Sequence, residues 1–164
     1  MKRFIIQLTI LLTVSIGALY LGLHSQILGP LFPGVITPTT QQIKINDTLI
    51  KVEVADTPAK RSKGLSGRES LATDSGMLFV YPQAQKYQFW MKGMKFALDM
   101  IFIKDGKVID EIVDVPAPAS GVPDTALPIY QPMTPIDMIL EVNSGFAKNH
   151  NIKIGDQIFI VKQS

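Results

Sequence analysis

Residues 89–103 read FWMKGMKFALDMIFI, and this stretch gives the clearest indication that the chain folds as β structure. Residues 85–91 predict one strand and residues 98–103 predict a second, with Gly93 allowing a sharp break between them. The stretch also contains the only tryptophan of the chain and a single carboxylate inside an apolar run. It is therefore both a structural element and the leading candidate for a functional site.

Strand alternation divides the side chains of the first predicted strand between two faces. Successive side chains of a strand point in opposite directions, so Phe89 and Met91 share one face while Trp90 and Lys92 share the other, more polar face. Two interpretations of the tryptophan follow. Its ring is a flat platform for a ligand such as a sugar, or it becomes core beneath the proline-rich segment 114–135.

Short segments of strand character continue on both sides of this stretch. Further strands are predicted at residues 43–45, 49–54, 76–81, 107–113 and 136–142, and a closing hairpin is predicted at residues 152–161. Thr57 and Pro58 supply an N-cap and a proline at the first helical position, which predicts one short helix. About seven or eight short strands with one helix are typical of an antiparallel sandwich or a partly closed barrel. The domain is therefore expected to be mainly β.

The N-terminus has the character of a membrane segment. Residues 4–23 are apolar apart from Gln7 and scattered serines and threonines, and twenty helical residues span about 30 Å, the thickness of a bilayer core. Lys2 and Arg3 precede this run, which predicts a single-pass protein of the cell membrane with a cytoplasmic N-terminus and an extracytoplasmic remainder. We interpret residues 1–28 as a signal anchor or transmembrane helix. A cleaved signal peptide is the alternative, and the protein would then be secreted.

The rest of the chain divides into a tether and a domain. Residues 29–40 contain three prolines between apolar residues, which predicts a stiff, semi-extended tether. Residues 41–164 are expected to form the extracytoplasmic β domain. Within it, residues 114–135 contain six prolines, and a loop of this length in a compact domain is usually functional or disordered.

Composition excludes several classes of protein. Removing Lys2 and Arg3 from the 16 basic residues leaves 14, equal to the 14 acidic residues, whereas a nucleic-acid-binding domain usually has a basic surplus. There are no cysteines, which excludes disulfides, thiolate zinc sites and cysteine nucleophiles. His24 and His150 are the only histidines, too few for a histidine metal site in one chain. We expect no nucleic-acid partner, no metal and no cofactor.

Asp99 is the most unusual ionisable residue of the chain. On a strand it shares a face with Ile101 and Ile103, and the opposite face is also apolar, so its carboxyl group is expected to be buried. A buried carboxylate is paired and hydrogen-bonded, or its pKa is raised. Lys92, Lys95 and Arg68 are the expected partners. Asp99 is then either a brace for a loop or ion pair, or a general base or ligand anchor.

Four further residues complete a candidate ligand-facing cluster. Arg68 follows a glycine-containing loop and can bind a carboxylate or another anion through two parallel hydrogen bonds, or serve a structural ion pair. Glu141 lies on a predicted strand, where a solvated face is the simplest interpretation and a pairing with Asp99 is the functional one. With Trp90 and Lys92 beside them, these residues form the cluster that we expect to face a ligand. No established catalytic motif accompanies it.

Several segments, taken in order, resemble a known family. These are VADTPAKR (54–61), GLSGR (64–68), GMLF (76–79), FWMK (89–92), LDMIF (98–102), LEV (140–142) and GD (155–156). Together they resemble the prokaryotic family called domain of unknown function 192, also called uncharacterised protein family 0127, over about residues 44–162. The resemblance implies a small, often exported or membrane-anchored, mainly β domain, and it implies no established activity. Members more often carry Asn and Thr where this chain has Gly93 and Met94.

Three functions are open at this point. The first is a membrane-anchored extracytoplasmic binding or accessory module of the prokaryotic envelope, with an unidentified small-molecule or envelope ligand. The second is a hydrolase or lyase that acts on an envelope glycan or peptide, with Asp99 or Glu141 as general acid or base. The third is a scaffold that binds a partner protein through the proline-rich segment 114–135, with Leu127, Ile129 and Tyr130 at the centre of an apolar patch.

Overall fold

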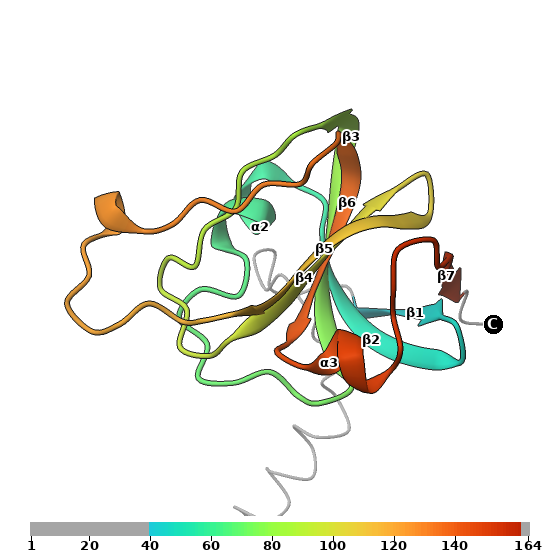
Figure 1. Cartoon of the computed structure of the whole chain (residues 1–164), viewed down its shortest axis with the longest axis horizontal. Coiled ribbons are helices and arrows are strands. Elements are labelled where there is room, and N and C mark those ends of the chain that lie inside the picture. The colour runs from blue at the N-terminus through green and yellow to red at the C-terminus, as the bar shows by residue number, and fades with distance from the viewer. Residues whose placement is uncertain (1–39, 162–164) are drawn as a thin grey trace, which may run out of the picture. The chain divides into compact units, whose positions relative to one another are not determined.

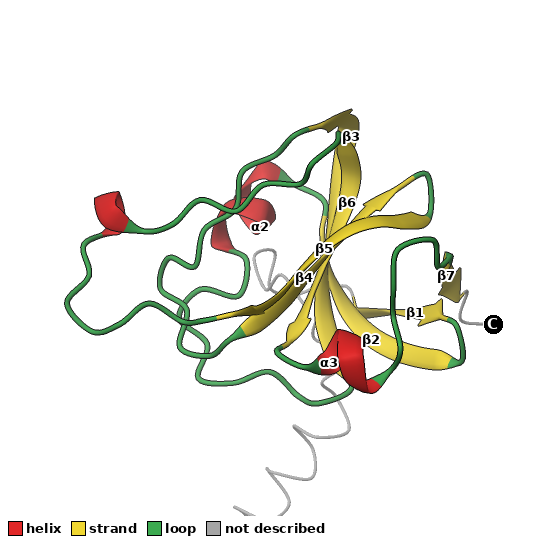
Figure 2. Cartoon of the chain, in the orientation of Figure 1, coloured by secondary structure: helices red, strands yellow, loops and turns green. Residues whose placement is uncertain are grey.

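The computed structural model describes residues 40–161, and they form a mainly β domain (Figures 1 and 2). This confirms the predicted class of fold. The predicted signal anchor (1–28) lies outside the described residues, as does the predicted tether (29–40) apart from its last residue. From residue 40 to residue 161, no helix combines the length and the apolar character needed to span a membrane.

The regular elements are short and joined by several long connections. The strands are β1 (Thr40–Ile45), β2 (Thr48–Ala55), β3 (Ser75–Gln85), β4 (Leu98–Lys104), β5 (Lys107–Val115), β6 (Ile136–Asn143) and β7 (Ile158–Val161). The helices are α2 (Pro58–Lys63), the 3-10 turn η2 (Asp124–Ala126) and α3 (Phe146–Asn149). Helix α2 begins as predicted, because the Thr57 side chain accepts a hydrogen bond from the Lys60 backbone N–H at 3.3 Å.

One seven-stranded sheet runs in the order β5-β4-β6-β3-β2-β1-β7 and curls until its two edges approach each other. At that seam the backbone N–H groups of Val108 and Ile158 donate to the carbonyl oxygens of Asp156 and Gly106, each at 2.9 Å. The partly closed barrel is therefore the correct one of the two predicted architectures, and the sandwich is wrong. All strand pairs are antiparallel except β2 and β3, whose parallel pairing requires the long connection that contains α2.

Strand alternation places two apolar clusters on the two faces of this sheet. Ile101 and Ile103 of β4 pack with Leu140 and Val142 of β6 in one cluster, together with residues of α3. The second cluster contains the intervening apolar residues of the same strands, among them Met100, Phe102 and Ile139, and it also contains Phe79 and Phe89. The face assignment predicted for residues 98–103 is thus confirmed. Two side chains of β6 that point to different faces are therefore separated by the sheet itself.

The predicted strand at residues 85–91 is wrong. Strand β3 continues through Pro82 to Gln85 instead of ending at the proline, and its pairing with β6 shifts register between Val80 and Gln85. A proline is tolerated there because a bulge interrupts the ladder of backbone hydrogen bonds. Beyond Gln85, Phe89 forms only an isolated bridge with Tyr130. The alternation of faces nevertheless holds, since Phe89 is buried and Trp90 is 57% exposed.

The proline-rich segment does not cover Trp90, so the prediction of a tryptophan buried beneath it is wrong. The segment is attached to residues 89–92 by two backbone hydrogen bonds between Phe89 and Tyr130, at 2.8 and 2.9 Å. An ion pair of 2.8 Å between Lys92 and Asp124 adds a second attachment. Of the residues predicted to centre an apolar patch, Ile129 is exposed, while Leu127 and Tyr130 are half-buried.

Candidate functional site

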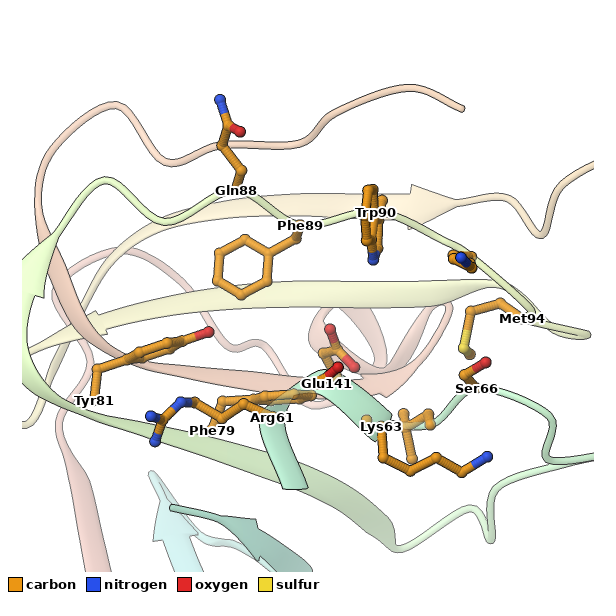
Figure 3. Close-up of a pocket in the computed structure, with 14 residues that line it drawn as sticks. Arg61, Lys63, Ser66, Phe79, Tyr81, Gln88, Phe89, Trp90, Met94 and Glu141 are labelled. Atoms are coloured by element: carbon orange, nitrogen blue, oxygen red, sulfur yellow. The ribbon is translucent and has the colours of Figure 1, made fainter. Parts of the chain in front are cut away.

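A pocket of about 260 Å³ opens on the face of the sheet that carries the second apolar cluster (Figure 3). One wall is the end of α2 with the loop after it, residues 61–66. The opposite wall comes from residues 88–94, and Phe79, Tyr81 and Glu141 of the sheet complete the lining. Apolar walls with a few converging polar groups are typical of small-molecule sites.

Glu141 projects into this pocket from the middle of β6 (Figure 3). Its strand neighbours on the same face are Met77 of β3 and Met100 of β4, so apolar side chains flank it on both sides. The residue is only 7% exposed, and no hydrogen bond or ion pair within residues 40–161 engages its carboxyl group. Burial raises the pKa of Glu141 to about 8. At neutral pH the group is therefore mainly protonated and can donate a hydrogen bond.

Tyr81 supplies a second hydroxyl group to the same space. Figure 3 shows its hydroxyl end directed toward the region of Glu141. Burial raises the pKa of Tyr81 to about 12, and the nearby Glu141 contributes to the increase. The ring is held by stacking on Tyr87, with 3.6 Å between centroids, and by the Arg61 guanidinium 5.0 Å from the ring centroid. The Tyr81 hydroxyl therefore keeps its proton over the physiological range of pH.

Three cationic side chains border the pocket, and they differ in how they are engaged. The Arg61 Nη1 atom donates to the carbonyl oxygens of Asp56 at 2.7 Å and Val80 at 2.8 Å, which fixes the guanidinium against the protein. Lys92 is paired with Asp124. Within the described part of the chain, no hydrogen bond or ion pair engages the Lys63 ammonium group. Lys63 is thus the cation available to a ligand.

Trp90 forms an exposed rim on this pocket. Its indole is 57% exposed, and the Lys92 ammonium nitrogen lies 5.8 Å from the ring centroid. An ammonium group is attracted to the face of an indole ring, and this attraction favours the observed position of Lys92 over Trp90. Figure 3 shows the indole on the side of the pocket opposite Lys63. Trp90 therefore offers an aromatic surface at the entrance while the carboxyl of Glu141 lies at the floor.

Glycine at position 93 brings the two walls of the pocket together. Gly93 has a φ of +67°, and a Cβ atom there would lie 2.3 Å from the Ser66 Oγ atom. Its carbonyl oxygen accepts a hydrogen bond of 2.8 Å from the Gly67 N–H. Only a residue without a side chain permits this approach, because both the backbone conformation and the contact exclude a Cβ. The loop after α2 can therefore pack directly against the turn after Trp90.

Asp99 lies on the opposite face of the sheet and does not reach the pocket. It is fully buried, and its carboxylate oxygens accept backbone N–H bonds from Asp114 at 2.9 Å, Gly145 at 3.2 Å and Ala147 at 2.9 Å. It is in register with Val142, whereas Glu141 is in register with Met100. Asp99 is thus a brace for three chain segments, and its predicted partners Lys92, Lys95 and Arg68 are wrong. A cleft that unites Asp99 with Glu141 is also wrong.

Arg68 forms an ion pair with Glu53 through two parallel hydrogen bonds of 2.5 and 2.7 Å. The hydrogen bond from Arg68, with the charge of its guanidinium, holds the pKa of Glu53 below its usual value, although partial burial opposes the effect. Glu53 is in register with Met77, which in turn is in register with Glu141, so the pair lies on the pocket face but two strands away. Arg68 does not line the pocket. The two predicted parallel hydrogen bonds of Arg68 are present, and their acceptor is the carboxylate of Glu53. The structural ion pair is therefore the correct one of the two interpretations.

The structure thus assembles Trp90, Lys92 and Glu141 from the predicted cluster and separates Arg68 and Asp99 from them. Sequence reasoning missed Lys63 and Tyr81. Tyr81 lies two residues after the buried Phe79 on β3 and therefore shares its face, which was a usable signal. Lys63 carried no such signal, because a lysine at the end of a helix is ordinarily a solvated residue.

The fold and the pocket define a small, partly closed β-barrel with one buried carboxyl group open to a ligand-sized space. Residues 41–160 match the family DUF192, described as "Uncharacterized ACR, COG1430". The chain therefore belongs to this family, as its ordered segments predicted. Among curated proteins no significant match is found.

Two solved structures share the fold. One is a protein of Sinorhizobium meliloti 1021 described as a "putative transcription regulator", with 26% identity, a TM-score of 0.69, and coverage of 77% of this chain and 98% of that chain. The other is a protein of unknown function from Novosphingobium aromaticivorans DSM 12444, with 25% identity, a TM-score of 0.68, and coverage of 77% and 89%. The alignments include most of each of these two proteins, so the shared unit is the whole β domain.

Proposed function

We propose that this protein is a membrane-anchored, extracytoplasmic binding module that holds a small polar ligand between Trp90 and Glu141. The observation that carries the proposal is the carboxyl group of Glu141, which is buried, has no hydrogen-bond or ion-pair partner among residues 40–161 and projects into a pocket. A buried polar group without a partner destabilises a fold by roughly 1–3 kcal/mol. A ligand that hydrogen-bonds to Glu141 recovers this loss, which gives the residue a role that an apolar residue would not fill.

The location of the module rests on the N-terminal sequence. The apolar run at residues 4–23, preceded by Lys2 and Arg3, supports an anchor with the β domain on the extracytoplasmic side. Alkaline phosphatase fused after residue 164 should be active in cells, because this enzyme requires export. Removal of residues 1–28 should abolish the activity. An inactive fusion of the full chain at normal abundance would contradict the proposed location.

The balance of charges supports a ligand other than nucleic acid. The Sinorhizobium meliloti relative is described as a "putative transcription regulator", but beyond Lys2 and Arg3 this chain has as many acidic as basic residues. Duplex DNA binds through many phosphate contacts and needs a basic surface. A gel-shift titration with duplex DNA at physiological salt should show no complex.

The binding function can be tested with the tryptophan itself. Trp90 is the only tryptophan of the chain, so the intrinsic fluorescence reports on the rim of the pocket. We expect at least one compound in a panel of monosaccharides, disaccharides, amino acids and dipeptides to change this fluorescence in a saturable manner. Glu141→Gln should weaken that binding. Asp47→Asn makes the same chemical change in the fully exposed β1–β2 turn and should leave it intact.

A second candidate function is a hydrolase or lyase that uses Glu141 as a general acid. It is favoured by the raised pKa of Glu141, which keeps a proton available at neutral pH. Lys63 and Glu141 also line the same pocket, although no second carboxylate from the described part of the chain does. Nuclear magnetic resonance spectra of bound panel compounds, recorded over hours, distinguish the two functions. New product resonances that disappear in Glu141→Gln would establish an enzyme, and unchanged spectra would leave a binding module.

A further inference from the structure

We propose that the ligand of this pocket is a single sugar acid, with its ring against Trp90, its hydroxyl groups toward Glu141 and Tyr81, and its carboxylate toward Lys63. The inference rests on the proposed binding function and narrows it to one chemical class. Three independent properties of the pocket lead to it: the charges along its border, the polar groups at its floor, and its size.

The charges along the border favour an anion. Arg61, Lys63 and Lys92 line the pocket, and Glu141 is the only acidic residue among those from 40 to 161 that does so. Arg61 and Lys92 are occupied by backbone carbonyl oxygens and by Asp124, respectively. No hydrogen bond or ion pair between Lys63 and another residue of the described range 40–161 engages its ammonium group, which lies beside the loop that follows α2, where a Cβ on Gly67 would be 3.6 Å away. An anionic group of the ligand would therefore be held by Lys63 in a charge-assisted hydrogen bond.

The floor of the pocket favours a ligand that carries hydroxyl groups. The carboxyl of Glu141 and the hydroxyl of Tyr81 both face the pocket and lack a hydrogen-bond partner within residues 40–161. A flat aromatic acid could contact Trp90 and Lys63, but it would bury both floor groups without partners. A sugar ring has an apolar face for the indole and hydroxyl groups along its edge for the floor. It satisfies the rim and the floor together.

The size of the pocket favours one ring. Its volume of about 260 Å³ lies just below the range of roughly 300–1,000 Å³ that accommodates drug-sized ligands. A monosaccharide fits such a space, whereas a longer glycan would have to extend past the rim into solvent. The module is thus expected to bind a free sugar acid or the terminal unit of an acidic glycan.

The direct test compares sugar acids with their neutral counterparts on the full chain. Titrations of D-glucuronate against D-glucose, and of D-galacturonate against D-galactose, are followed by Trp90 fluorescence and by calorimetry. We expect at least one acid to bind about tenfold more tightly than its neutral counterpart. Equal affinity for both members of each pair would overturn this inference and leave the binding function standing. Failure of both acids to bind, while another compound of the wider panel binds, would do the same.

A variant of Lys63 tests the contact that selects the acid. Lys63→Gln should weaken binding of the acid about tenfold, toward the affinity of the neutral sugar, and should change binding of the neutral sugar much less. Lys104→Gln removes a similar charge from the exposed end of β4, away from the pocket, and serves as the matched control. If Lys63→Gln and Lys104→Gln weaken the acid equally, the effect is one of overall charge and the assignment of Lys63 is refuted.

The dependence of binding on pH provides a second readout. The charged or titratable groups around the pocket are Arg61, Lys63, Tyr81, Lys92 and Glu141, and Glu141 is the one expected to titrate between pH 6 and 9. Ionised Glu141 would repel the carboxylate, so affinity for the acid should fall as the pH rises past about 8. In Glu141→Gln the affinity should be independent of pH over this range. A pH profile that the variant leaves unchanged would overturn the placement of the ligand beside Glu141.

Discussion

Replacement of Glu141 by glutamine should stabilise the protein in a manner that depends on pH. Burial raises the pKa of Glu141 from 4.5 to about 8 in the folded state. Between these values the folded protein retains a proton that the unfolded chain has lost, so stability is fully present below pH 4.5 and decreases as the pH rises toward 8. Each unit of pKa difference corresponds to about 1.4 kcal/mol. The loss is therefore on the order of 3 kcal/mol at pH 7 and about 4 kcal/mol at pH 8, and it approaches its limit of about 5 kcal/mol above pH 8.

The glutamine variant cannot titrate, so it should escape this loss. Urea denaturation of the full chain, followed by circular dichroism between pH 4.5 and 8.5, gives the free energy of unfolding of both proteins. The difference between the variant and the wild type should be smallest near pH 4.5 and should grow in favour of the variant with increasing pH. Asp47→Asn should parallel the wild type. Parallel curves for the wild type and Glu141→Gln would refute the raised pKa of this residue.

Three further substitutions address the elements that position the pocket. Asp99→Ala leaves three backbone N–H groups without their acceptor, one buried and two partly buried, and urea denaturation should show a loss of roughly 3 kcal/mol or more; a loss below about 1 kcal/mol would contradict the bracing role. Gly93→Ala places a Cβ against Ser66 at a positive φ, and should cost at least about 1–2 kcal/mol by thermal unfolding. Arg68→Ala breaks the half-exposed pair with Glu53, and should cost less than about 1 kcal/mol; a loss above about 3 kcal/mol would show that the pair matters more than its exposure implies.

Much of the strand structure could be predicted because it is local. The alternation within residues 98–103 assigns each side chain to its face without knowledge of any partner strand. The extended segment after β3 could not be assigned in the same way. Phe89 pairs with Tyr130, far along the chain, through a single isolated bridge. The sequence pattern around Phe89 does not show whether this segment makes one bridge or a full strand. Pro82 was misleading because a bulge removes the usual penalty for proline within a strand.

The candidate site was harder to predict because it depends on register. Asp99 and Glu141 look alike in the sequence, since each is a carboxylate with apolar neighbours on both sides along its strand. They differ in what lies across from them: Asp99 is opposite Val142, and Glu141 is opposite Met100. This offset of one residue places them on different faces of the sheet. It gives Asp99 a set of backbone donors and gives Glu141 a pocket.

The seam between β5 and β7 is closed by a few backbone hydrogen bonds at one end of each strand, around Val108 and Ile158. Elsewhere the sheet is paired along most of each strand. Opening this seam breaks few backbone hydrogen bonds, although Val108 and Ile158 pack in the first apolar cluster. Its amide protons should therefore exchange with solvent through local fluctuations more readily than those of the fully paired strands. The amides of Gly145 and Ala147, which donate to the buried Asp99, should exchange only when the domain unfolds. The barrel can therefore open most easily where β7 contacts β5. Opening there would expose an edge strand, and an exposed edge strand can pair with a second chain.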